Sequence, residues 1–173
     1  MARKILIMLC ALFVLPAFIM IGCDTTEKID ELKADFSADF SCEYRKMDIS
    51  GSLSCNGQKL MNITFDSPKT ISGLSVSYKG SDMEISRENL ICSADEAYIP
   101  ESSFPNITHQ IFCGINDGRA VFKGKCKNVC TYSMTTSWGD AVITSDSKGF
   151  VYKISLEKED YILTLSDAKS SAD

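Results

Sequence analysis

The chain has 173 residues, with 18 lysines and arginines against 23 aspartates and glutamates and a formal net charge of −5. This negative balance argues against a nucleic-acid partner, because neutralising phosphates requires clustered cations. It equally disfavours electrostatic adhesion to anionic lipid. The length suits one globular domain behind a targeting segment.

The first 22 residues predict an export signal. Arg3 and Lys4 form a positive start, and no charged residue occurs between Lys4 and Cys23. The segment ends in Met-Ile-Gly-Cys at positions 20–23, which resembles a bacterial lipobox. That resemblance implies cleavage before Cys23 and a diacylglycerol on its thiol. Two acyl chains are enough for stable membrane attachment.

An ordinary secretory signal and an uncut membrane anchor are the alternatives. Residues 5–22 fall slightly short of the roughly 20 that span a bilayer, and Pro16 disfavours a permanent helix there. Loss of Arg3 and Lys4 would make the mature chain more negative, so the lipid on Cys23 must provide the anchor. We therefore expect a lipid-anchored protein on the extracytoplasmic face of the bacterial cell membrane.

The mature chain divides into a tether, one domain and a tail. Residues 23–35 are predicted to be a lipid-anchored tether with a helix that begins near Thr26. The domain covers residues 36–166, and residues 167–173 are predicted to be a polar, frayed tail. Apolar residues alternate with polar ones in the domain, which predicts antiparallel strands. These strands lie near 36–45, 49–55, 61–65, 74–78, 83–85, 120–126, 130–134, 141–143, 150–156 and 161–165.

The middle of the domain changes its period. Apolar residues at 107, 111 and 115 predict a helix from about Asn106 to Cys113, closed by Gly114. The class is therefore α+β. A twisted sheet of nine or so strands tends to curl, and the two short helices would cover its apolar concave face as a lid. Any space that they leave would be a hydrophobic pocket.

The predicted pocket is lined by apolar residues that share the inner face of successive strands. Its expected lining residues are Phe40, Leu53, Ile63, Phe65, Val76, Ile85, Phe122, Met134, Tyr152 and Ile154.

The cysteines suggest disulfides. Cys10 lies in the signal, Cys23 is the lipid site, and an even number remains in an exported domain. Spacing alone permits 15 pairings of six cysteines. Strand parity favours two pairs, Cys42 with Cys55 and Cys126 with Cys130. This leaves Cys92 to pair with Cys113 at the end of the helix. The competing interpretation is a zinc site on Cys113, Cys126 and Cys130, but the sequence has no Cys-x2-Cys motif.

The sequence contains no convincing active site. His109 is the only histidine, and no nucleophile elbow, glycine-rich phosphate loop or His-Glu-x-x-His motif occurs. Trp138 is a candidate partner anchor or a residue at the rim of the core. We expect a non-enzymatic protein that needs no metal and no cofactor.

The run from Phe65 to Gly80, with its Phe-x-x-Pro, Gly-Leu and Tyr-x-Gly elements, resembles a segment of LolA-like lipoproteins of spore-forming Firmicutes. The order of elements over residues 36–166 resembles the same group, which includes clostridial spore-germination lipoproteins. This resemblance implies an open antiparallel half-barrel (LolA/LolB-like) with a short helical lid. In the carriers of this fold the cavity takes acyl chains. The six mature cysteines are not part of the carrier pattern.

Two functions follow as hypotheses. In the first, the half-barrel cavity binds an apolar ligand, an acyl chain or a lipid. In the second, the protein is an adaptor that docks an envelope or spore-cortex protein.

Overall fold

The computed structural model describes residues 31–33, 35–56 and 60–170. The predicted signal, the lipid site Cys23 and the predicted helix near Thr26 lie outside these residues, so they stay predictions. Among the residues that the structure describes, no helix has the length and apolar character needed to cross a membrane.

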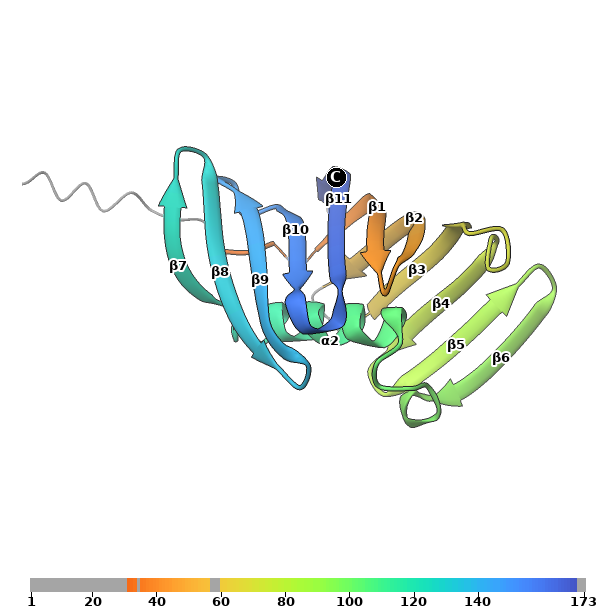
Figure 1. Ribbon diagram of the computed structural model, residues 1–173. Helices are drawn as coiled ribbons and strands as arrows, with labels where there is room; N and C mark the ends of the chain where they lie inside the picture. The colour runs from red at the N-terminus through yellow and green to blue at the C-terminus, as the bar shows by residue number, and fades with distance from the viewer. Residues whose placement is uncertain (1–30, 34, 57–59, 171–173) are drawn as a thin grey trace, which may run out of the picture.

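All described strands belong to one antiparallel sheet, in the order β6-β5-β4-β3-β2-β1-β11-β10-β9-β8-β7. Their bounds are β1 Phe36–Tyr44, β2 Met47–Asn56, β3 Leu60–Ser67, β4 Leu74–Lys79, β5 Asp82–Arg87, β6 Leu90–Asp95, β7 Val121–Cys126, β8 Val129–Thr136, β9 Gly139–Asp146, β10 Val151–Leu156 and β11 Tyr161–Ser170. Two short 3-10 helices, η2 at Glu96–Tyr98 and η3 at Glu157–Glu159, occur in connections. The sheet bends around α2 (Phe104–Asn116), the one α-helix among the residues that the structure describes (Figure 1).

The topology consists of two meanders. Strands β1 to β6 form the first and β7 to β11 the second, with α2 between them in the chain. The meanders join where β1 pairs with β11 along its whole length, from Phe36 opposite Ser170 to Tyr44 opposite Tyr161. Strand β11 thus includes residues 167–170, so the predicted tail begins later than expected. The expected open antiparallel sheet with a helix is confirmed.

Helix α2 runs from Phe104 to Asn116, longer than predicted. Its start lies before Asn106 because Pro105 occupies the first turn, where a missing N–H costs nothing. Gly114 does not close it. The end is set by Gly118, which has φ +69° and donates its N–H to the carbonyl of Ile115, while Arg119 donates to Gly114.

The core lies between the inner face of the sheet and α2. Strand β1 shows the principle, since its burial alternates at every residue from Phe36 to Tyr44. Phe104 packs on Phe40 at 5.4 Å between ring centroids, and Phe112 packs on Phe36 at 5.2 Å. The helix therefore follows the inner face of β1 from one end to the other. The far strands β5 and β6 extend beyond it (Figure 1).

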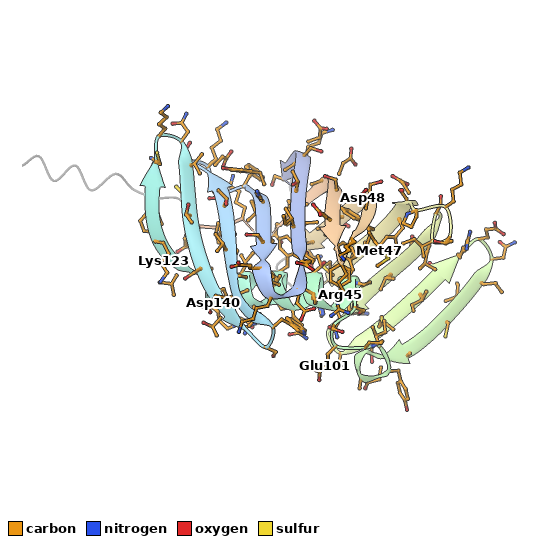
Figure 2. The ribbon with its side chains drawn as sticks, viewed as in Figure 1. Arg45, Met47, Asp48, Glu101, Lys123 and Asp140 are labelled. Atoms are coloured by element: carbon orange, nitrogen blue, oxygen red, sulfur yellow. The ribbon has the colours of Figure 1, made fainter. Side chains whose placement is uncertain are left out.

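The two meanders are also linked at one end of the central strands β1 and β11. Arg45, in the turn between β1 and β2, forms an ion pair with Glu159 of η3 and donates its backbone N–H to the carbonyl of Asp160. Tyr44 donates its hydroxyl to the carbonyl of Ser102, which precedes α2. Arg45 and Glu101 accordingly lie at the same end of the molecule (Figure 2).

Gly51 should be intolerant of any side chain. It pairs with Phe40 and Phe65, and a Cβ there would meet the backbone carbonyl of Thr64. We expect Gly51→Ala to lower the free energy of unfolding by about 1–3 kcal/mol, because the strand must shift. Gly124→Ala is the matched control, since its Cβ would enter open space. Urea unfolding measures both, and equal stabilities would contradict the packing described here.

Candidate functional site

Most predicted pocket residues are packed core residues in the structure. Ile63 and Ile154 have no exposed surface, and Leu53, Val76 and Met134 are each 2% exposed. Phe40 and Phe65 are equally buried and contact Phe104 of α2. The helix thus fills the space above them, and their role as ligand contacts stays a prediction.

Three of the predicted residues lie at the margins of the core. Tyr152 is half-buried, because a register shift between Val151 and Lys153 places Val151 inside instead. Phe122 is 39% exposed and packs edge-on against Tyr132. Ile85 is half-buried.

Ile85 belongs to an apolar surface on the inner face of β4, β5 and β6, which we call the β4–β6 rim. Two adjoining rows make it, since Val76 pairs with Ile85 and Ile85 with Cys92, while Leu74 pairs with Arg87 and Arg87 with Leu90. Exposure rises along the rim from Val76, 2% exposed, to Leu90, 77% exposed. The rim is therefore continuous with the core at one side and open at the other. The rim is defined as Leu74, Val76, Ile85, Leu90 and Cys92.

Arg87 gives the rim a charged end. It lies between Leu74 and Leu90 in the same row and donates one hydrogen bond, 3.3 Å long, to the carbonyl of Thr70. A guanidinium has five N–H donors and carries a positive charge. The remaining donors suit a carboxylate or phosphate. Apolar side chains beside a cation match an amphiphile with an anionic headgroup.

A hollow of about 500 Å³ lies at the other end of these strands. Its lining includes Asp95, Glu101, Arg119 and the half-buried Trp138. Asn106 also lines it, and its Oδ1 is buried without a hydrogen-bond partner. This lining mixes polar and apolar side chains, and none of the predicted pocket residues belongs to it, so the hollow is not the apolar pocket that the sequence predicts.

The polar residues of α2 that face the sheet bind α2 to it. Thr108 Oγ1 lies 2.9 Å from the hydroxyl of Tyr161 and donates to the carbonyl of Phe104. The His109 ring stacks on Tyr78 at 4.1 Å between centroids. His109 therefore packs against the sheet, and its Nε2 lies 3.3 Å from the Sγ of Cys113 on the same helix.

The predicted disulfide between Cys42 and Cys55 is wrong, because β1 and β2 pair in another register. A two-residue turn at Arg45 and Lys46 places Cys42 opposite Ile49 and Cys55 opposite Phe36, at opposite ends of the hairpin. A disulfide needs Cα atoms about 4.4–6.8 Å apart. All six described cysteines are thiols in the structure.

The other two pairs fail for related reasons. The turn at Lys127 and Asn128 sets Cys126 opposite Val129, which leaves Cys130 on the opposite face. A register shift between Phe122 and Gly124 causes this change of face. Cys113 neighbours Cys55 of β2, whereas Cys92 lies on β6, four strands from β2, or roughly 19 Å along the sheet. Because Cys126 and Cys130 lie on opposite faces, they also do not come together as ligands of one zinc ion.

Burial is the main cause of the raised pKa values of two groups on the inner face. Burial raises the pKa of the Cys42 thiol to about 12, although a backbone hydrogen bond with Ile162 opposes the shift. Burial also raises the pKa of Tyr161 well above its usual value, and the hydrogen bond with Thr108 lowers it only in part. These groups stay protonated at neutral pH.

Comparison with known proteins identifies the fold. No family model matches the sequence, and no curated protein matches it. A solved structure of an uncharacterized conserved protein from Thermus thermophilus is similar, with a TM-score of 0.54, 8% identity and 80% of each chain covered. At this identity the likeness shows the fold alone.

Two further solved structures are similar at lower TM-scores. One is a LolA superfamily protein from Nitrosomonas europaea, with a TM-score of 0.42, 12% identity and coverage of 82% of this chain and 88% of that one. The other is a DUF1329 family protein from Desulfovibrio piger, with a TM-score of 0.39, 12% identity and coverage of 80% and 86%. Membership of the Firmicute lipoproteins stays a prediction.

Cys42 should be protected from alkylation in the native protein. Its thiol is 3% exposed, and the raised pKa leaves almost no thiolate, the reactive form, at mildly alkaline pH. We expect iodoacetamide to label Cys126, which is exposed, many-fold faster than Cys42. Mass spectrometry of digested protein gives both rates. Unfolding in guanidinium should make the rates similar, whereas rapid native labelling of Cys42 would contradict its burial.

Proposed function

We propose that this protein is a non-enzymatic cell-envelope lipoprotein that binds the acyl chain of an anionic amphiphile along the β4–β6 rim. The observation that carries the proposal is the exposure of Leu90 on a concave apolar surface that continues into the core. A soluble domain rarely leaves such a surface uncovered without a use for it. The rim lies on strands that extend beyond α2 (Figure 1).

The rim differs from the cavity that the sequence predicts. Burial of Phe40, Leu53 and Ile63 under α2 leaves no room for a chain in the centre of the sheet. A chain lying beside α2 would instead contact Ile85 and Leu90. Each CH2 group removed from water there contributes about 0.8 kcal/mol, so a few groups give measurable binding.

The headgroup would lie at Arg87. Its row places the guanidinium between two leucines, so a carboxylate or phosphate and the first methylene groups can be contacted together. In this arrangement the half-barrel holds its ligand at the edge of the sheet.

The lipid anchor is the second part of the proposal. Cleavage before Cys23 and attachment of diacylglycerol would place the domain on the extracytoplasmic face of the cell membrane. The negative net charge supports attachment through the lipid on Cys23, because the domain itself has little attraction for anionic lipid.

Binding is tested with a fluorescent long-chain fatty acid and the mature chain. Leu90 and Ile91 are adjacent on β6 and are 77% and 67% exposed, but they face opposite sides of the sheet. We expect Leu90→Asp to weaken binding about tenfold or more, because a carboxylate would enter the rim. Ile91→Asp, the matched control on the outer face, should bind like the wild type.

The Arg87→Gln variant distinguishes the contribution of the headgroup to binding from that of the acyl chain. We expect it to weaken binding of the fatty-acid probe and to leave binding of the corresponding fatty alcohol unchanged. Equal loss with Leu90→Asp and Ile91→Asp, or no binding by the wild type, would refute the rim as the site. Recovery of a protein partner from membranes in place of lipid would favour the adaptor function.

The anchor is tested separately. We expect Cys23→Ala to move the protein from the membrane fraction to the soluble fraction, because the substituted residue has no thiol to carry diacylglycerol. Intact mass of the purified wild type should show loss of residues 1–22 and gain of the lipid. Membrane association of Cys23→Ala would contradict the lipid anchor.

A further inference from the structure

A row of four inner-face residues crosses the central strands near one end of α2. Phe36 pairs with Cys55, Cys55 with Met61, and Met61 with Tyr78, from β1 to β4. All four side chains are at most 4% exposed. Cys55 therefore lies in the middle of a defined row, between Phe36 on one side and Tyr78 on the other.

Helix α2 lies directly on this row. Phe112 contacts Phe36 at one end of it, and His109 stacks on Tyr78 at the other end. Cys113 follows Phe112 in the helix, and its Sγ lies 3.3 Å from His109 Nε2. Two fixed contacts on either side thus place Cys113 above β2 and β3, where Cys55 is.

The environment of Cys55 agrees with this placement. The pKa of the Cys55 thiol is raised to about 12, first by burial and next by the neighbouring Cys113, with a smaller contribution from Asp35. A hydrogen bond with Asn116, one turn beyond Cys113 on α2, lowers it in part. Cys55 therefore interacts with two consecutive turns at the end of the helix.

We propose that Cys55 and Cys113 form a disulfide that fastens the end of α2 to β2, with His109 assisting its formation. This pairing replaces Cys92 as the partner of Cys113. It stands on strand register and ring contacts in the centre of the sheet, so it is independent of ligand binding at the rim.

The oxidant in this reaction is an external disulfide, either a protein dithiol oxidase or a small-molecule disulfide. The Cys113 thiol gives its proton to His109, and its sulfur attacks the external disulfide. A mixed disulfide forms, and one external thiolate leaves and takes the proton. Cys55 then attacks the Cys113 sulfur, which releases the second external thiol. Two protein thiols are oxidised, and one external disulfide is reduced to two thiols.

The two cysteines differ in their accessibility to solvent. Cys113 is half-buried, whereas Cys55 is 4% exposed. Cys113 is therefore the sulfur that an external disulfide meets first, and Cys55 resolves the mixed disulfide.

The pairing is tested by peptide mapping of unreduced mature protein made in an oxidising compartment. Trypsin alone is insufficient, because residues 88–119 carry both Cys92 and Cys113 on one peptide. Trypsin with a glutamate-specific protease separates them, because Glu96 and Glu101 lie between. We expect residues 47–59 linked to residues 102–119, lighter by two hydrogen atoms than the two thiol peptides. Residues 89–96, with Cys92, should appear outside this linked pair.

A functional readout accompanies the map. Reductant should lower the Tm of the wild type and leave the Tm of Cys55→Ser unchanged, while the control Cys92→Ser should respond like the wild type. His109→Gln should slow formation of the bond by an external disulfide without changing the final map. Both peptides recovered as thiols, or Cys113 linked to any other cysteine, would overturn the proposal. The map uses native protein, so it decides the matter even if a variant fails to fold.

Discussion

The pairing of β1 with β11 is the constraint on which the rest of the structure depends. It joins strands that are more than a hundred residues apart and turns two meanders into one sheet. Only a continuous sheet presents an inner face wide enough to receive α2, which enters between the meanders. Phe40 and Tyr161 show the coupling, because they come from different meanders and both contact Phe104.

The same constraint explains why the inner face is unevenly covered. A 13-residue helix is about 20 Å long, whereas an 11-stranded sheet is far wider than one helix. The strands at the joint are therefore buried, whereas on β5 and β6 Ile85 is half-buried and Leu90 is 77% exposed. The candidate site arises from this mismatch, and not from a cavity enclosed within the core.

The sequence predicts ten of the eleven described strands, because alternation is a local property, but it misses β6. Phe36 to Tyr44 alternate without interruption, and the structure buries those residues alternately. Register is less predictable, because it depends on turns without a sequence signal. Arg45 and Lys46 adopt positive φ angles of 48° and 67° although neither is glycine or asparagine. The turn places Cys42 opposite Ile49, six residues before Cys55 in the chain. The bulge near Lys123 moves Cys126 to the other face.

The cysteines illustrate how tertiary contacts decide what pattern alone leaves open. Parity correctly places Cys42 and Cys55 on the inner face. However, Cys42 pairs with Ile49 and Cys55 with Phe36, and neither partner has a thiol. The partner for Cys55 must then come from the layer above, where α2 carries Cys113 beside His109. A bond in this position fixes one end of the helix against β2. It leaves the rim on β4 to β6 untouched, so a ligand could enter and leave there without displacing α2 from the core.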